Sequence, residues 1–361
     1  MIYLDYQATT PLAPEAREAM LPWLGGPGTT GFANPHSAHR AGRAAAAAIE
    51  VARDQVARLL PPGGRVIFTS GATEAINLAM RGCGAQRMAV SAIEHAAVLD
   101  TARAIDPDVA VLPVDGEGLV DPATELPHHV GLVAVMQVNN EIGTIQPVDA
   151  IAARARAMGA RLLCDAVQGA GRLDAPGEAD FIAISAHKLY GPKGIGALWV
   201  REGVPLAPLN TGGGQEAGLR SGTLSPALAA GFGAAAALCT TLWESDARHV
   251  EHLWARLRAG LSGWTLNGSA DRRWRGNCNV RLAGLDSARL LSECRSLAIS
   301  AGSACASGSG RPSHVLRAIG LSDKEAKSAL RIGFGRYTCG EELDEAVAAI
   351  MAAARAQGLL P

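Results

Sequence analysis

Short apolar runs alternate along the chain with longer amphipathic stretches, which predicts strands separated by helices. Helical spacing of the apolar positions predicts helices over Ala44–Leu60 and Val148–Met158, among others. The predicted strands are Val66–Thr69, Arg87–Ser91, Val109–Pro113, Gly131–Gln137, Arg161–Asp165, Phe181–Ser185 and Ala197–Val200. This order favours an α/β fold with a mostly parallel central sheet and helices on both faces.

The C-terminal part of the chain predicts a second, smaller unit. A long helical region, from about Pro226 to Leu261, leads into strands near Asn279–Leu282 and Ala298–Ala301. We therefore expect a large α/β domain over residues 14–245 and a smaller α+β domain made of residues 1–13 and 246–361. The stretch Pro226–Trp243 is apolar but rich in alanine and glycine, which favours a buried or interface helix over a membrane span.

Composition excludes several classes of function. The net charge of −1 and the pI near 6.8 give no electrostatic argument for binding nucleic acid or membranes. The seven cysteines are scattered, without the paired spacing of a zinc site, so no metal site is expected. They are typical of reduced thiols in a cytoplasmic protein, and the N-terminus lacks the pattern of a signal peptide.

Lys188 is one of only four lysines, whereas twenty-nine residues are arginine. A guanidinium cannot replace a primary amine in a Schiff base, so a covalent cofactor would need one of these lysines. Lys193 lies in a Gly-Pro-Lys-Gly turn, and Lys324 and Lys327 lie in a charged helical stretch, so all three are expected at the surface. Lys188 alone follows a buried-type strand, Phe181–Ile184, and is the candidate for a covalent amine.

Asp165 follows the predicted strand Ala160–Cys164, 23 residues before Lys188. One acid at a strand end is equally compatible with a structural role as the cap of the next helix. Pyridoxal phosphate, however, requires a lysine for its attachment and a carboxylate at its ring nitrogen. The C-terminal ends of strands are also where α/β sheets place ligands. The pair therefore suggests this cofactor.

A possible phosphate site lies at the start of a helix. Arg65–Ser70 is predicted as a strand, and Gly71–Glu74 opens the helix Ala75–Met80. The free N–H groups of a first helical turn attract an anion, and Thr73 adds a hydroxyl. Taken alone, the pattern is more typical of an ordinary helix cap. No glycine pattern that cradles a nucleotide follows any strand.

Cys305 lies in a segment of small residues, 300–310, which has no apolar anchor and is predicted to be mobile. The segment could be a flexible linker that happens to carry a cysteine. An exposed thiol is reactive, however, and this favours a role in group transfer.

In combination, these residues resemble the fold-type I pyridoxal phosphate enzymes. More narrowly, they resemble the cysteine desulfurases of the class V aminotransferase family, which supply sulfur for iron–sulfur cluster assembly. The matching motifs occur in one order over nearly the whole chain. They are Tyr3–Pro11, Asn34-Pro35 with His39, Ser70–Glu74, Glu94-His95, Val138–Gly143, Asp165–Gln168, His187–Gly194, Gly212–Glu216, Arg220–Thr223, Gly302–Cys305, Arg331 and Gly335–Thr338.

The resemblance implies a role for each residue of a pyridoxal phosphate site. His95 would stack on the pyridine ring and move protons, although a histidine taken alone is more often a satisfied core or surface residue. Gln168 would hydrogen-bond the phenolic oxygen of the ring, and Asn140 would lie near that oxygen and the substrate carboxylate. The implied phosphate ligands are Ala72, Thr73, Ser185, His187 and, from the neighbouring subunit, Thr223. Thr223 thus implies a homodimer with shared sites.

The resemblance also implies conversion of L-cysteine to L-alanine. Arg331 would bind the substrate carboxylate, where a surface ion pair is the alternative. Lys188 would move the Cα proton, and the Cys305 thiolate would take the sulfur as a persulfide for delivery to an acceptor protein. The mobile segment resembles that of the long-loop desulfurases. The chain ends at Pro361, without the longer tail of housekeeping desulfurases, which leaves the acceptor open.

Two alternatives remain open from the sequence. One is a selenocysteine lyase or a pyridoxal phosphate aminotransferase on the same scaffold, although the Cys305 segment disfavours simple transamination. The other is a non-catalytic partner subunit. It is disfavoured because Lys188, Asp165, His95, Cys305 and Arg331 are all present.

Overall fold

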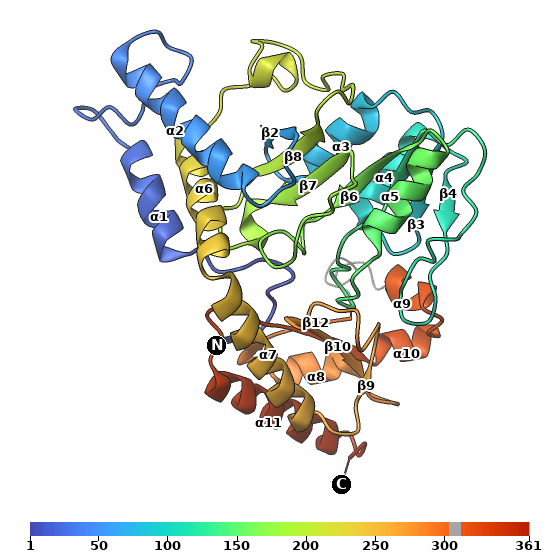
Figure 1. Cartoon of the computed structure of the whole chain (residues 1–361). Helices are drawn as coiled ribbons and strands as arrows, with labels where there is room; N and C mark the ends of the chain where they lie inside the picture. The colour runs from blue at the N-terminus through green and yellow to red at the C-terminus, as the bar shows by residue number, and fades with distance from the viewer. Residues whose placement is uncertain (303–311, 361) are drawn as a thin grey trace.

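Seven strands form the central sheet of the larger unit (Figure 1). The computed structural model describes residues 1–302 and 312–360. The strands follow the order β2 (Gly64–Thr69), β8 (Gly196–Arg201), β7 (Phe181–Ser185), β6 (Arg161–Asp165), β5 (Leu132–Ala134), β3 (Met88–Ser91) and β4 (Ala110–Leu112). All neighbours from β7 to β4 are parallel, whereas β8 is antiparallel to both β7 and β2. The predicted mostly parallel sheet is confirmed.

Helices cover both faces of this sheet, and each face has its own hydrophobic core. The helices of one face are α3 (Ala72–Gly82) and α4 (Ala96–Ile105). Those of the other are α1 (Pro14–Met20), α2 (Arg40–Ala57), α5 (Val148–Ala157) and α6 (Pro226–Thr241). Neighbouring strand residues such as Ile67 and Phe68 point to opposite cores. Because both faces of the sheet are covered by apolar cores, the strands are continuous apolar runs in the sequence.

Two helix boundaries differ from prediction. The helix predicted over Ala44–Leu60 begins earlier, at Arg40, because Nδ1 of His39 accepts the N–H of Gly42 and caps the first turn. The helical region predicted from Pro226 to Leu261 is two helices, α6 and α7 (Trp243–Gly260), bent by 74° at Leu242. The bend takes α7 out of the core of the large sheet and into a second core.

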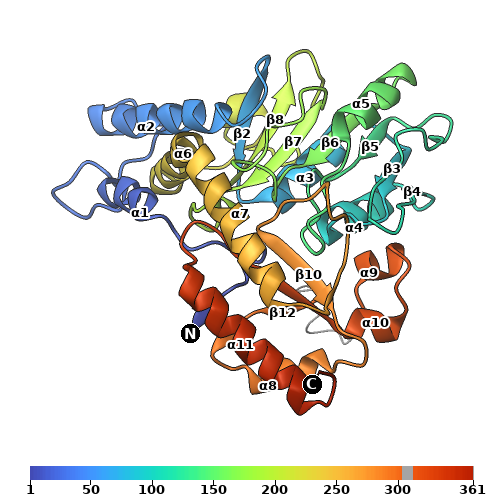
Figure 2. The ribbon, with the colours of Figure 1, turned by 60° about the horizontal axis from the view of Figure 1, so that its bottom comes forward.

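The second core belongs to a smaller unit. Its four-stranded antiparallel sheet has the order β12 (Ser300–Ala301), β13 (Ala329–Gly333), β10 (Asn277–Arg281) and β9 (Thr265–Leu266), while β1 (Ile2–Tyr3) pairs in parallel with β11 (Leu297–Ala298). Figure 2 shows α7 beside α11 (Gly340–Ala356), with α8 (Ser287–Glu293) next to them. The N-terminal residues Ile2 and Leu4 are buried in the same core. The exact domain boundaries stay a prediction.

Two short helices near the C-terminal end pack against the larger unit. The short helices α9 (His314–Ala318) and α10 (Asp323–Lys327) share a small core with Ile93 and Met136 of the larger unit. The 3₁₀ turns in residues 1–302 and 312–360 are η1 (Leu21–Trp23), η2 (Ala186–Lys188) and η3 (Glu216–Gly218). Within the described residues, no single helix has the length and apolarity to cross a membrane, and only the bent pair α6 and α7 meets those criteria when taken together.

Candidate active site

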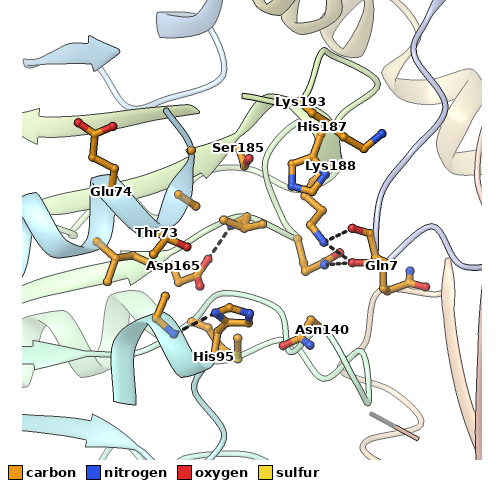
Figure 3. Close-up of a pocket in the computed structure, with 18 of the residues that line it drawn as sticks. Gln7, Thr73, Glu74, His95, Asn140, Asp165, Ser185, His187, Lys188 and Lys193 are labelled. Carbon is orange, nitrogen blue, oxygen red and sulfur yellow. Dashed lines mark hydrogen bonds between the residues drawn. The ribbon is translucent and has the colours of Figure 1, made fainter. Parts of the chain in front are cut away.

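A cavity of about 530 Å³ lies where the C-terminal ends of β6 and β7 meet the N-terminus of α3 (Figure 3). It brings together most of the predicted site residues, namely Ala72, Thr73, His95, Asn140, Asp165, Gln168, Ser185, His187, Lys188 and Arg331. Thr223 is exposed beyond η3 and does not line the cavity. Cys305 lies outside the described residues.

Lys188 ends the 3₁₀ turn η2, directly after β7. Its Nζ donates hydrogen bonds to the main-chain oxygens of Gln7 and Ala8, the latter at 2.7 Å. Burial, followed by the charges of Arg331 and Arg172, lowers the pKa of Lys188 to about 8, although Asp165 and Asp5 oppose this shift. A lysine with such a pKa is partly deprotonated near neutral pH, and the deprotonated form is the nucleophile.

We expect the Lys188 amine of the cofactor-free protein to become reactive near pH 8, rather than near its ordinary value of 10.5. Competitive labelling with acetic anhydride, followed by mass spectrometry of the peptide, measures this midpoint. Asp165→Asn should lower it further, because the Asp165 charge favours the ammonium form. The exposed Lys324 is an internal reference for the reagent. A midpoint at the ordinary value would show that the Lys188 amine is not buried beside Arg331 and Arg172.

Asp165 is the last residue of β6, and its carboxyl is buried. Oδ1 accepts the N–H of Val167 at 3.0 Å. Burial raises the pKa of Asp165, while that hydrogen bond and the charges of His95 and Lys188 act in the opposite direction. A buried carboxylate of this kind is stabilised by a cation placed beside it. A protonated pyridine nitrogen is such a cation.

The N-terminus of α3 forms one side of the cavity, with Ala72 and the Thr73 side chain at its first turn. Ser185, His187 and Lys193 line the same cavity (Figure 3). Burial and the neighbouring Lys188 and Lys193 lower the pKa of His187 to about 4, so its imidazole is neutral at neutral pH. A helix N-terminus, two hydroxyl groups and the Lys193 ammonium suit a phosphate.

His95 and Arg331 complete the walls. His95 caps α4, where its Nδ1 accepts the N–H of Ala97 at 3.1 Å, so the neutral imidazole carries its hydrogen on Nε2. Arg331 lies on β13 and is 1% exposed. Its Nη2 forms an ion pair with Asp5 at 2.8 Å, and its Nη1 donates to the main-chain oxygen of Asn140 at 3.2 Å. Its buried Nε has no partner among the described residues.

The N-terminal segment contributes to the site in a way that the sequence pattern did not predict. The main-chain oxygens of Gln7 and Ala8 hold the Lys188 amine, and Asp5 holds Arg331. The motif Tyr3–Pro11 marked this segment as part of the family pattern, but it assigned no role. A main-chain carbonyl has no residue-type signature, so no sequence pattern could have identified the first two contacts. Lys193 was predicted at the surface, and it is exposed while also lining the cavity.

Together these residues fit pyridoxal 5'-phosphate. Lys188 offers an amine of lowered pKa, and Asp165 offers a buried carboxyl without a described ion pair. The N-terminus of α3 with Lys193 offers an anion site within the same cavity. These groups match the carbonyl, ring nitrogen and phosphate of the cofactor.

Comparisons with known proteins agree with this geometry. The family model described as aminotransferase class-V matches residues 2–346. A cysteine desulfurase IscS of Rickettsia rickettsii (strain Iowa) is 42% identical over 369 residues, which cover 96% of this chain and 89% of that protein. A solved structure described as a NifS-like protein has a TM-score of 0.88 and 30% identity, and covers 99% of this chain and 100% of its own. A structure of SspA in complex with cysteine has a TM-score of 0.81 and 34% identity, and covers 94% and 100%.

Proposed function

The chain belongs to the class-V aminotransferase family. We propose that Cys305 of this chain accepts the sulfur of L-cysteine. The chain is an enzyme, a cysteine desulfurase that uses pyridoxal 5'-phosphate. The observation that best supports the proposal is the placement of Lys188, Asp165 and Arg331 around one cavity. These residues offer an amine for the cofactor, a carboxyl for its ring and a cation for the substrate carboxylate.

The chain's own residues hold the cofactor in this proposal. Lys188 would bind it covalently, and Asp165 would pair with its ring nitrogen. The first turn of α3, with Thr73, Ser185, His187 and Lys193, would bind its phosphate. When bound, pyridoxal phosphate supplies an electron sink for the charge that develops at the substrate Cα.

Arg331 binds the substrate carboxylate. Its guanidinium is held on two sides by Asp5 and the Asn140 main chain, which leaves the buried Nε as a donor without a described partner. An orphan donor of this kind gains a charge-assisted hydrogen bond when a carboxylate binds. The Lys188 amine then accepts the proton from Cα, and His95, with the hydrogen on Nε2, is a second proton donor in the cavity.

Cys305 supplies the nucleophile for sulfur in this proposal. Its thiolate attacks the sulfur of the substrate, so that an S–S bond forms as the Cβ–S bond breaks. The electron pair of the broken bond stays with the carbon skeleton, and protonation there yields L-alanine. The sulfur remains on Cys305 as a persulfide, ready for transfer to an acceptor protein, with iron–sulfur cluster assembly as its proposed destination.

Arg331→Lys tests the substrate site. Lysine keeps the positive charge but lacks the planar guanidinium with its several N–H donors. We therefore expect KM for L-cysteine to rise about 10- to 100-fold with a smaller change in kcat. Initial rates of alanine formation measure both constants. Arg281→Lys is the matched control, since Arg281 lies on the neighbouring strand β10 and does not line the cavity. An unchanged KM in the Arg331 variant would remove Arg331 from the substrate site.

We further propose a homodimer and a cytoplasmic location. Thr223 is exposed, which suits a contact with the phosphate site of a second subunit rather than with its own cavity. The six cysteines within the described residues form no disulfide, which is typical of a reducing compartment.

A further inference from the structure

Arg172 lies behind the cavity wall and contacts two cavity residues at once. Its Nη1 donates to the main-chain oxygen of Gln168 at 2.9 Å and to the side-chain Oε1 of Gln168 at 3.2 Å. Its Nη2 donates to the main-chain oxygen of Lys188 at 2.6 Å. Arg172 itself does not line the cavity. One guanidinium therefore ties Gln168, which follows β6, to Lys188, which follows β7.

The Gln168 side chain is consequently fixed in one orientation. Its Oε1 accepts from Arg172, while its Nε2 donates to the main-chain oxygen of Gln7 at 3.0 Å. Rotating the amide by half a turn would set the NH₂ group against the N–H donors of Arg172, and Oε1 against the oxygen of Gln7. Both new contacts would be repulsive. Arg172 and Gln7 together thus determine which end of the amide carries the donor.

This orientation matters for what the cavity can bind. The amide nitrogen has two hydrogens, and Gln7 takes one of them. The second is a donor on a residue that is 4% exposed and lines the cavity. The phenolic oxygen of pyridoxal phosphate is an acceptor, so it is stabilised by an N–H donor and opposed by a carbonyl oxygen.

The Arg172 guanidinium also restrains the main chain at Lys188, the residue to which the cofactor would be attached. Its bond to the Lys188 main-chain oxygen is the shortest of the three hydrogen bonds of Arg172. The side chain of Lys188 extends to the oxygens of Gln7 and Ala8. The positions of the amine and of the amide donor therefore depend on one shared arginine.

We propose that Arg172 is a positioning residue that orients the Gln168 amide and the Lys188 main chain toward pyridoxal phosphate. The inference rests on the proposed function, because that cofactor is what accepts the Gln168 donor and bonds to Lys188. Arg172 acts through these two residues and does not touch the cofactor.

A double-mutant cycle tests this mechanism. Apoproteins of the wild type, Arg172→Met, Gln168→Leu and the double variant are titrated with pyridoxal phosphate, and quenching of tryptophan fluorescence gives Kd. We expect each single change to weaken binding about tenfold, and the double change to weaken it no more than the stronger single one. An arginine that supports the fold without acting through the Gln168 amide predicts independent effects that multiply. A double variant weakened by the product of the two factors would overturn the proposal.

Arg161→Met is the matched control. Arg161 also donates to a main-chain oxygen, that of Cys83 at 2.7 Å, but it lies at the opposite end of β6 from the cavity. The Kd of the Arg161→Met variant for pyridoxal phosphate should stay within about twofold of the wild-type value. If Arg172→Met does not fold, as judged by thermal melting of the apoprotein, Arg172→Lys replaces it in the cycle. Lysine keeps the positive charge but lacks the planar guanidinium that contacts Gln168 and Lys188 together. We therefore expect the same non-additive effect on Kd.

The outcomes separate this inference from the proposed function. A wild-type protein that does not bind pyridoxal phosphate covalently through Lys188 would refute the proposed function itself. Covalent binding in the wild type together with independent effects of Arg172 and Gln168 would refute only the positioning role.

Discussion

Replacing Lys188 by alanine should abolish covalent binding of pyridoxal phosphate and lower the rate of desulfuration on the order of 10³- to 10⁴-fold. The change removes both the amine that bonds the cofactor and the base that accepts the Cα proton. Alanine fits at this position, since the turn η2 is held by main-chain hydrogen bonds such as that from Leu189 N–H to Ala186. The loss of function should therefore occur without loss of the fold.

Borohydride reduction followed by denaturation and mass spectrometry measures covalent attachment directly. The wild type should retain the cofactor on the peptide that contains Lys188, and Lys188→Ala should release it. Lys324→Ala is the control, because Lys324 is exposed on α10 and does not line the cavity. Lys193 is the other lysine that lines the cavity. Cofactor found on Lys193, or still attached in the Lys188 variant, would contradict the assignment.

Replacing Cys305 by serine should leave cofactor and substrate binding intact, while release of sulfide from L-cysteine under reductant falls to the rate without enzyme. Serine is nearly isosteric, but its hydroxyl is not ionised at neutral pH and does not accept sulfur. Sulfide release is measured with a colorimetric assay, and Kd for pyridoxal phosphate is measured in parallel.

Cys339→Ser is the matched control for this experiment. Cys339 is the exposed cysteine among the described residues, and the other five there are buried. It caps α11, away from the cavity. Sulfide release that persists in Cys305→Ser and disappears in Cys339→Ser would move the acceptor thiol to position 339.

The sequence predicted best those elements whose apolar pattern arises from burial alone. The strands β6 and β7 are buried on both faces, and their apolar runs ended at Asp165 and Ser185 as predicted. The break between α6 and α7 was not predicted, because Leu242 continues an apolar helical pattern and no proline or glycine marks the bend. The bend instead separates the two cores.

Some residues of the candidate site could be predicted from the sequence, and others could not. Lys188 and Asp165 could be predicted because an amine and a carboxylate at neighbouring strand ends carry a chemical meaning. Arg172 could not, because arginine is abundant in this chain and its partners are two main-chain oxygens and one amide oxygen. The pairing of Asp5 with Arg331 spans nearly the whole chain, and only the folded structure reveals it.

Transfer of sulfur from L-cysteine to Cys305 can be measured directly by brief exposure of the pyridoxal phosphate-loaded enzyme to L-cysteine, followed by alkylation, digestion and mass spectrometry. We expect the peptide containing Cys305 to gain the mass of one sulfur atom in the wild type, and no peptide to gain it in Lys188→Ala. An unmodified Cys305 peptide in an enzyme that still produces alanine would show that sulfur does not pass through Cys305.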